Sequence, residues 1–289
     1  MFKKAFLFPG QGSQFVGMGR DLYNNFKEAK LVFEEVDDAL SMPLSKIIFE
    51  GPDLELSMTE NTQPAIMAVS IAHYLSSGLE SSINNDVIFA GHSLGEYSAL
   101  VAAKSLSLSD AAKLLKIRGR AMQESCKNIN SAMAALLGVE IEEVRHILDQ
   151  LADPQYICEV ANHNSKEQIV ISGHAEAVQK VIDYFKTIQK RAIMLKVSAP
   201  FHCSLIKEAE EYMQDSMARV KIQEPLYPIL SNVTADFYGD TEEIRALLAR
   251  QVTSSVRWYE IMQLMVENGV SEVEEFGPGD ILKNLFKRH

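Results

Sequence analysis

The stretch DVIFAGHSLGEYSALVAA, residues 86–103, constrains this chain more than any other part of its sequence. An apolar run from Val87 to Ala90 is followed by a serine between two glycines, and then by a run of helix formers that begins at Glu96. The pattern G-x-S-x-G between a strand and a helix is typical of a nucleophile elbow, in which a sharp turn holds the hydroxyl at the head of the helix. The alternative is a tight turn with an incidental serine. The order of elements favours Ser93 as a nucleophile, but it does not distinguish hydrolysis from transfer.

The size and composition of the chain fit one large globular domain or two unequal ones. Its 289 residues are 47% hydrophobic and 23% charged, which is enough to bury a large core and argues against disorder. The net charge of -11 argues against nucleic acid or an anionic membrane as a partner. No segment is long and apolar enough to span a membrane. Cys126, Cys158 and Cys203 form neither a disulfide framework nor a metal site, so we expect a cytoplasmic protein without a metal.

The order of the elements predicts an α/β fold with a hydrolase-like parallel sheet. The apolar run AFLF, cut off by a Pro-Gly pair, reads as a first buried strand, and a glycine-rich loop follows it. Apolar residues at helical spacing from Leu22 to Phe33 predict one helix, and a second helix, the elbow strand and the elbow helix come next. The following helix is expected to start with Ser109 or Asp110 as its N-cap. Strands that alternate with helices in this way are typical of a parallel sheet.

From about Asn130 the predicted order changes to β-α-β-β-α-β. Four segments read as strands (SAMAALLGV, YICEVANHN, EQIVISG and RAIMLKV) and two as helices (EIEEVRHILDQL and HAEAVQKVIDYFKTIQ). This is the ferredoxin-like order, and about seventy residues suit an inserted subdomain. We therefore expect a large catalytic α/β domain made of residues 1–128 and 198–289, with a smaller ferredoxin-like α+β subdomain inserted at 129–197.

A serine nucleophile needs a base, and His202 is the candidate among the seven histidines. It follows the sequence SAPF where the chain returns to the large domain, at the expected cleft between the two domains. An ordinary imidazole titrates near about pH 6.5, so we expect the reaction to slow below that pH. The acidic residues considered for a triad fall within the expected subdomain, so a backbone carbonyl could orient His202 instead. They are Asp149, Asp153 and Asp183.

Two further residues suggest what the serine reacts with. Gln11 lies in the glycine-rich loop PGQGSQ, where backbone amides could approach an acyl oxygen and form an oxyanion hole with the amide of Leu94. The alternative is an ordinary turn glutamine. Arg118 lies 25 residues after Ser93 on a helix with an apolar pattern, and a buried guanidinium suits a carboxylate. Taken alone, a solvated arginine would be the simpler interpretation of Arg118.

Six motifs match a known family in order and spacing. They are FPGQGSQ at 8–14, GHSLGEYSAL at 91–100, RGRAM at 118–122, NHNS and QIVISG within 162–173, FHCSL at 201–205 and EFGPG at 275–279. With these motifs the chain resembles the malonyl-CoA:acyl carrier protein transacylases, the acyltransferases of bacterial fatty acid synthesis, which also occur as domains of polyketide synthases. The resemblance covers essentially the whole chain.

The resemblance implies a ping-pong transfer of a malonyl group from coenzyme A to the phosphopantetheine thiol of an acyl carrier protein, through an acyl-serine. It implies that Ser93 is the nucleophile and that His202 is the base. It also implies that Arg118 binds the malonyl carboxylate, and that Gln11 and the N–H of Leu94 form the oxyanion hole.

Supporting residues, substrates and partners follow from the same resemblance. The main-chain carbonyl of Gln251 would replace the triad acid, Asn162 would line the cleft, and Phe201 would favour malonyl over the bulkier methylmalonyl. Coenzyme A thioester would be a substrate, with no permanently bound cofactor, and we expect a monomer. Basic residues near the subdomain edge are candidates for docking an acidic carrier protein, although a solvated helix face explains them as well: Lys186, Lys190, Arg191 and Lys196.

Three other interpretations compete with this one. A stand-alone malonyl-selective acyltransferase of a polyketide pathway would carry the same motifs. A serine esterase or thioesterase would use the same elbow, but it predicts a carboxylate partner for His202 and leaves Arg118 unexplained. A non-catalytic relative that only binds carrier protein is disfavoured, because Ser93, His202, Arg118 and Gln11 are all present.

Overall fold

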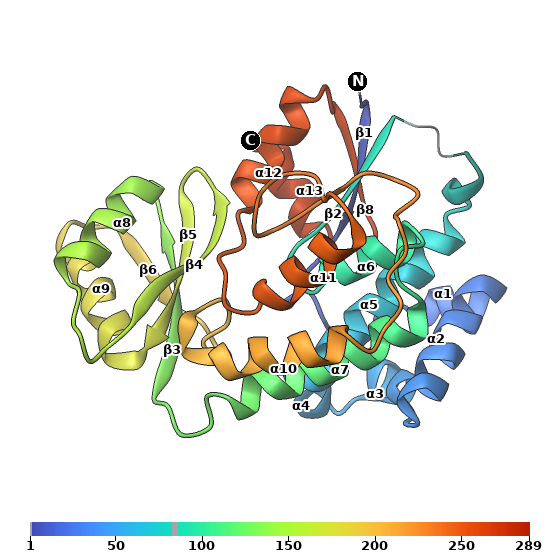
Figure 1. Ribbon diagram of the computed structural model, residues 1–289, viewed down its shortest axis with the longest axis horizontal. Helices are drawn as coiled ribbons and strands as arrows, with labels where there is room; N and C mark the ends of the chain where they lie inside the picture. Colours follow the sequence, from blue (N-terminus) through green and yellow to red (C-terminus); the bar gives the residue numbers. More distant parts are fainter. Residues whose placement is uncertain (1, 83–85) are drawn as a thin grey trace.

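The computed structural model describes residues 2–82 and 86–289, and these residues form two four-stranded sheets (Figure 1). In the first sheet the strands lie in the order β7-β2-β1-β8, and every neighbouring pair is parallel. Its strands are β1 (Lys4–Phe8), β2 (Val87–Gly91), β7 (Ile229–Leu230) and β8 (Glu272–Glu275). This sheet is the hydrolase-like part of the predicted fold, and the prediction of a parallel sheet is confirmed.

Helices cover both faces of the parallel sheet. The helices before the second sheet are α1 (Arg20–Asn25), α2 (Lys27–Leu40), α3 (Leu44–Glu50), α4 (Asp53–Leu56), α5 (Thr59–Ser76), the 3-10 turn η1 (Leu79–Ser82), α6 (Gly95–Ala102) and α7 (Leu108–Glu124). Those after it are η2 (Ser204–Ile206), α10 (Lys207–Met217), α11 (Thr241–Arg250), α12 (Trp258–Glu267) and α13 (Ile281–Phe286). None of the helices in the described part of the chain is long and apolar enough to cross a membrane.

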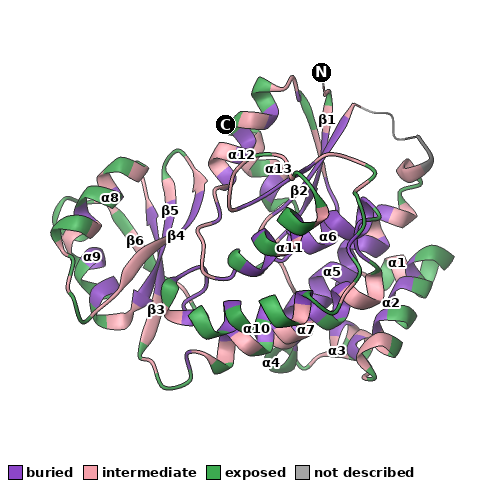
Figure 2. Ribbon diagram, viewed as in Figure 1, coloured by how far each residue is buried: buried purple, intermediate pink, exposed green. Residues whose placement is uncertain are grey.

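Alternate residues of β1 contribute to two separate hydrophobic cores. Phe6 and Phe8 belong to the larger core, which includes buried residues of α2, α5 and α7. Ala5 and Leu7 belong to a second core, which Trp258 and other residues of α12 complete. Successive side chains of a strand point to opposite faces, so this division shows that the sheet is covered on both sides. In Figure 2 the buried residues are accordingly concentrated around β1, β2, α5 and α6.

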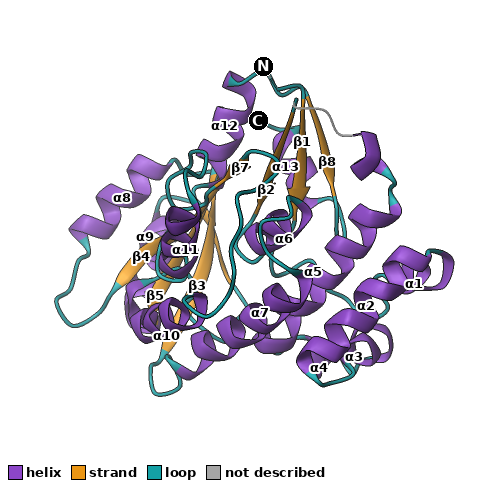
Figure 3. Ribbon diagram, turned by 45° about the vertical axis from the view of Figure 1, so that its right-hand side comes forward, coloured by secondary structure: helices purple, strands orange, loops and turns teal. Residues whose placement is uncertain are grey.

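The second sheet is antiparallel and forms the separate subdomain at the left of Figure 1, with its two helices. Its strands lie in the order β4-β5-β3-β6, which is the ferredoxin-like arrangement. The elements are β3 (Ser131–Leu137), α8 (Ile141–Gln150), β4 (Cys158–Ser165), β5 (Gln168–His174), α9 (Ala175–Thr187) and β6 (Arg191–Met194). The predicted β-α-β-β-α-β order is therefore confirmed, and Figure 3 distinguishes these strands (orange) from the helices (purple). Buried residues of the sheet and of both helices form a third core.

Two local predictions are wrong. The helix predicted from Leu22 to Phe33 is interrupted at Phe26, whose extended conformation (φ -127°, ψ 123°) separates α1 from α2. The N-cap of α7 is Ser107 instead of either predicted residue, and its hydroxyl accepts a 3.0 Å hydrogen bond from the N–H of Asp110. The N-cap thus lies three residues before the N–H that it satisfies, as is usual at helix starts.

The elbow is a close contact between the backbones of β1 and α6. A Cβ atom added at Gly95, the first residue of α6, would lie 2.1 Å from the carbonyl oxygen of Phe8, and one added at Gly91 would lie 1.9 Å from the carbonyl carbon of Gly95. Ser93, between these glycines, has a φ of 53°, in the left-handed region that few non-glycine residues adopt. Only glycine on both sides lets the chain turn this sharply and present the serine.

We expect Gly95→Ala to lower the free energy of unfolding by about 2 kcal/mol or more, because the backbone of Phe8 must move to admit the methyl group. Urea unfolding followed by circular dichroism measures this. Gly239→Ala is the matched control, since a Cβ there would meet only the flexible carboxylate of Glu243. Equal losses for the two variants would contradict the account of the elbow.

Candidate active site

Ser93 lines a cleft with a cavity volume of about 350 Å³. Its Oγ is 2.8 Å from Nε2 of His202. Its backbone N–H donates to Oδ1 of Asn232 at 2.7 Å, while Nδ2 of the same asparagine donates to the carbonyl oxygen of Gly91 at 2.7 Å. Asn232 therefore bridges the two ends of the elbow and holds Ser93 in its left-handed conformation.

The imidazole of His202 is held in one tautomer by backbone carbonyls. Its Nδ1 lies 2.9 Å from the oxygen of Gln251 and 3.1 Å from that of Ser254. Since a carbonyl oxygen can only accept, Nδ1 carries the proton and Nε2 can accept the proton of Ser93. No carboxylate of the described residues contacts this histidine, so carbonyls occupy the place where a triad would have its acid.

Burial, and to a lesser extent the positive charge of Arg118, lower the pKa of His202 to about 3. The two carbonyls act in the opposite direction but do not offset these effects. The ordinary value near about 6.5 holds for a solvated ring, and the burial of His202 shifts its pKa well below it. The side chain is 4% exposed, so its protonated form would be an unsolvated cation beside another cation.

Arg118 of α7 is 1% exposed, so it is not the solvated arginine that was the simpler interpretation. Its Nη1 donates to Oε1 of Gln63 at 2.8 Å, and its Nη2 donates to Oε1 of Gln251 at 2.8 Å and to Oγ of Ser93 at 3.1 Å. Its buried Nε has no partner among the described residues. A buried guanidinium held by neutral groups, with an unused N–H, is suited to receive an anion.

Two backbone N–H groups that line the cleft are free. Gln11 and Leu94 both line it, and in the described parts of the chain neither residue donates a hydrogen bond from its backbone nitrogen. Gln11 follows β1 and Leu94 follows β2, and these strands are neighbours whose last residues, Phe8 and Gly91, are paired. Free amides at this position are what an oxyanion hole requires.

The remaining predicted residues are divided between the cleft and the surface. Asn162, Phe201 and Lys196 line the cleft. Lys186 forms an ion pair with Asp183 at 3.8 Å, and Lys190 donates to a backbone carbonyl; neither is among the residues that line the cleft. Of the four basic candidates for docking, Lys196 alone is therefore placed at the cleft.

Three polar residues of the site were not predicted from the sequence. Gln63 precedes a proline in a helix, and Asn232 lies in a loop far along the chain. Glu96 is in the first turn of α6, where an acidic residue usually indicates an exposed helix start, yet it is fully buried. Glu96 lies within the motif GHSLGEYSAL, but nothing in the sequence indicates its burial, and the partners of all three residues lie on elements distant in sequence.

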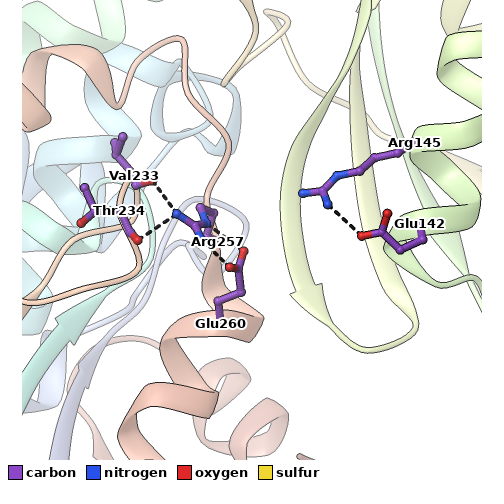
Figure 4. Close-up of polar contacts among 6 residues, drawn as sticks. All are labelled: Glu142, Arg145, Val233, Thr234, Arg257 and Glu260. Carbon is purple, nitrogen blue, oxygen red and sulfur yellow. Dashed lines mark hydrogen bonds and ion pairs between the residues drawn. The ribbon is translucent and has the colours of Figure 1, made fainter.

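The loop that carries Asn232 is anchored by Arg257, the residue that immediately precedes α12. Nη1 of Arg257 donates to the carbonyl oxygen of Thr234 at 2.8 Å and to that of Val233 at 3.4 Å, while its Nε and Nη2 donate to the carboxylate of Glu260 (Figure 4). In addition, the backbone N–H of Arg257 donates to the carbonyl oxygen of Asn232 at 3.1 Å. The fork of Arg257 thus fixes the loop from which Asn232 reaches Ser93.

Comparison with known proteins identifies the family. The family described as "Acyl transferase domain" matches residues 5–282. A malonyl CoA-acyl carrier protein transacylase of Bacillus subtilis (strain 168) is 43% identical over 289 residues, which span 100% of this chain and 90% of the relative. The chain belongs to the malonyl-CoA:acyl carrier protein transacylase family.

Solved structures agree with this membership. The crystal structure of an acyl-carrier-protein S-malonyltransferase from Bartonella henselae superposes with a TM-score of 0.94 at 44% identity, covering 99% of this chain and 92% of that one. A malonyl-transacylase in complex with its type II polyketide synthase acyl-carrier protein superposes with a TM-score of 0.94 at 36% identity, covering 99% and 92%. The likeness therefore extends over both sheets, and the cleft between them is the candidate active site of a transacylase family member.

The buried environment of His202 predicts a flat pH profile for acylation of Ser93. Only the neutral imidazole can accept a proton, and a pKa of about 3 keeps it neutral throughout the range from about pH 8 to pH 5. We expect the single-turnover acylation rate to change by less than about twofold over this range. Rapid-quench measurements of the acyl-enzyme would test it, and a fall with an apparent pKa near 6.5 would contradict the burial of the base.

Proposed function

We propose that this chain transfers a malonyl group from malonyl-CoA to the phosphopantetheine thiol of acyl carrier protein and so supplies fatty acid synthesis. The relatives that cover its whole length carry this activity in their names. The observation that carries the proposal for the site is Arg118, a buried cation with no ion pair among the described residues, whose Nη2 lies 3.1 Å from the nucleophile. An acyl group attached to Ser93 would place a carboxylate within reach of that cation.

The first half-reaction forms the acyl-serine. Oγ of Ser93 attacks the thioester carbonyl carbon while Nε2 of His202 takes the hydroxyl proton. The backbone N–H groups of Gln11 and Leu94 stabilise the oxyanion of the tetrahedral intermediate. When the carbon–sulfur bond breaks, coenzyme A leaves as a thiol with the proton that His202 returns.

The second half-reaction uses the same groups in reverse. The thiol of the carrier protein attacks the ester carbonyl carbon, and His202 takes its proton. The carbon–oxygen bond to Ser93 breaks, and the serine oxygen recovers the proton from His202. One base and one oxyanion hole thus serve both halves of the ping-pong cycle, and the reaction needs no bound cofactor.

Arg118 would exchange one partner for another during acylation. In the free enzyme its Nη2 donates to the hydroxyl of Ser93. After acylation that oxygen belongs to an ester and is a weaker acceptor, so the N–H becomes available to the malonyl carboxylate. A charge-assisted pair of this kind contributes about 1.5–3 kcal/mol and explains the choice of a dicarboxylic acyl group.

The site favours transfer over hydrolysis but does not choose a pathway. An esterase of the triad type would orient His202 with a carboxylate, whereas Nδ1 of His202 contacts carbonyl oxygens. A polyketide role remains the second candidate, because a relative at 36% identity is in complex with a polyketide acyl-carrier protein. A cytoplasmic location, a monomeric state and the malonyl preference assigned to Phe201 stay predictions.

We expect Arg118→Ala to reduce malonyl loading by about tenfold to a hundredfold, because the malonyl carboxylate loses its charge-assisted pair. Acetyl loading should be spared or improved, since an acetyl group has no carboxylate to lose and the pocket becomes less polar. Arg118→Lys should recover only part of the malonyl rate, because an ammonium cannot form the parallel fork.

The measurement is the ratio of malonyl to acetyl loading from the two coenzyme A thioesters, in wild type and in both variants. An equal fall for the two substrates would mean that Arg118 is structural, and the assignment of the carboxylate site would then fail.

A further inference from the structure

Glu96 is a buried carboxylate that the reaction described above does not use. It is 0% exposed and lies one helical turn after Ser93. Its Oε1 accepts from the hydroxyl of Tyr238 and, at 3.1 Å, from the backbone N–H of Asn232, and its Oε2 accepts from Nε2 of Gln251. Burial has the largest effect on the pKa of Glu96 and raises it to about 7, even though these three hydrogen bonds and the charge of Arg118 act in the opposite direction. Donors therefore surround it, as an ionised carboxylate requires.

The side-chain amide of Gln251 lies between this carboxylate and Arg118. Its Nε2 donates to Glu96, and its Oε1 accepts from Nη2 of Arg118 at 2.8 Å. The reverse orientation would place the amide –NH2 against the guanidinium and the carbonyl oxygen against the carboxylate. Both contacts would then be repulsive, so the two charges fix the orientation of the amide.

The position of the negative charge has a consequence for substrate binding. A buried guanidinium with no counterion nearby would be strongly destabilising, and Arg118 has no ion pair among the described residues. A carboxylate in direct contact with Arg118 would stabilise it, but would occupy the fork that a substrate carboxylate needs. An anion separated from the cation by one amide group satisfies both requirements.

We propose that Glu96 is the counterion of Arg118, held one amide group away so that the guanidinium stays available to a substrate carboxylate. This inference rests on the proposed role of Arg118 in binding the malonyl group. Glu96 touches neither the substrate nor the reacting atoms in this account. It is a positioning residue that acts through Gln251 and helps to set the preference for a charged acyl group.

The test moves the negative charge from position 96 to position 251, where it contacts Arg118 directly. In the double variant Glu96→Gln/Gln251→Glu the net charge is unchanged, and the new amide at position 96 can still donate to the new carboxylate at 251. The anion now contacts Arg118 and competes with the substrate carboxylate. We expect the ratio of malonyl to acetyl loading, measured at about pH 8, to fall by at least about tenfold.

Gln251→Glu alone is the second variant and keeps the test decisive if the double variant does not fold. It too places a carboxylate on Arg118, and Glu96 can take up a proton and donate to it. Both variants lose the 3.1 Å bond from Gln251 to the carbonyl oxygen of Ser93. That loss affects both substrates alike, so it cancels in the ratio.

The matched control is Glu275→Gln, because Glu275 is also buried, its pKa is also raised to about 7, and its carboxylate accepts from the backbone of Lys283 outside the cleft. The ratio of malonyl to acetyl loading of Glu275→Gln should equal that of wild type. A folded variant with a carboxylate at 251 and a ratio within about twofold of wild type, or an equal fall for both substrates, would overturn the proposal. Failure of the proposed function can be told apart from failure of this inference, because in the former case wild type itself would not load malonyl.

Discussion

The close approach of β1 to the start of α6 is the constraint on which the site depends. Because Gly95 lies against the carbonyl of Phe8, the chain turns sharply enough to place Ser93 in a left-handed conformation at the head of the helix. The pairing of β1 with β2 brings the loop after each strand to the same edge of the sheet. The backbone N–H groups of Gln11 and Leu94, which have no partner in the described parts of the chain, therefore lie at one cleft together with Ser93.

The site also depends on a group of buried polar residues whose charges and dipoles are fixed before the substrate binds. Gln251 joins its parts: its carbonyl orients His202, and its side chain contacts Arg118, Glu96 and the backbone of Ser93. In such a low-dielectric site a base stays neutral and a cation attracts an anion strongly. We infer that the same burial which keeps His202 unprotonated also makes the acyl pocket selective for a carboxylate.

The sequence predicts those parts of the architecture that depend on residues close together in the chain. The alternation of strands and helices predicted the parallel sheet, and the β-α-β-β-α-β order predicted the antiparallel subdomain. The elbow pattern located Ser93, since G-x-S-x-G constrains the backbone within five residues. The polar sequence EVEE of β8 was not recognised as a strand, because its pairing with β1 is specified by the rest of the sheet.

Properties that depend on distant contacts were missed for a physical reason. Glu96 looks like an ordinary acidic residue at a helix start until the loop with Tyr238 and the segment with Gln251 close over it. The pKa of His202 likewise depends on burial and on Arg118, neither of which a motif encodes. The motifs thus indicate where Ser93 and His202 lie in the chain, whereas the burial of His202 and the contacts of Glu96 follow only from the fold.

The mass of the intact protein after brief exposure to malonyl-CoA decides whether Ser93 carries the acyl group. Wild type should gain one malonyl group that persists in buffer and is lost when holo acyl carrier protein is added, and Ser93→Ala should gain none. A malonylated Ser93→Ala protein, or a wild-type adduct that is lost equally fast without carrier protein, would contradict the proposed transfer through Ser93.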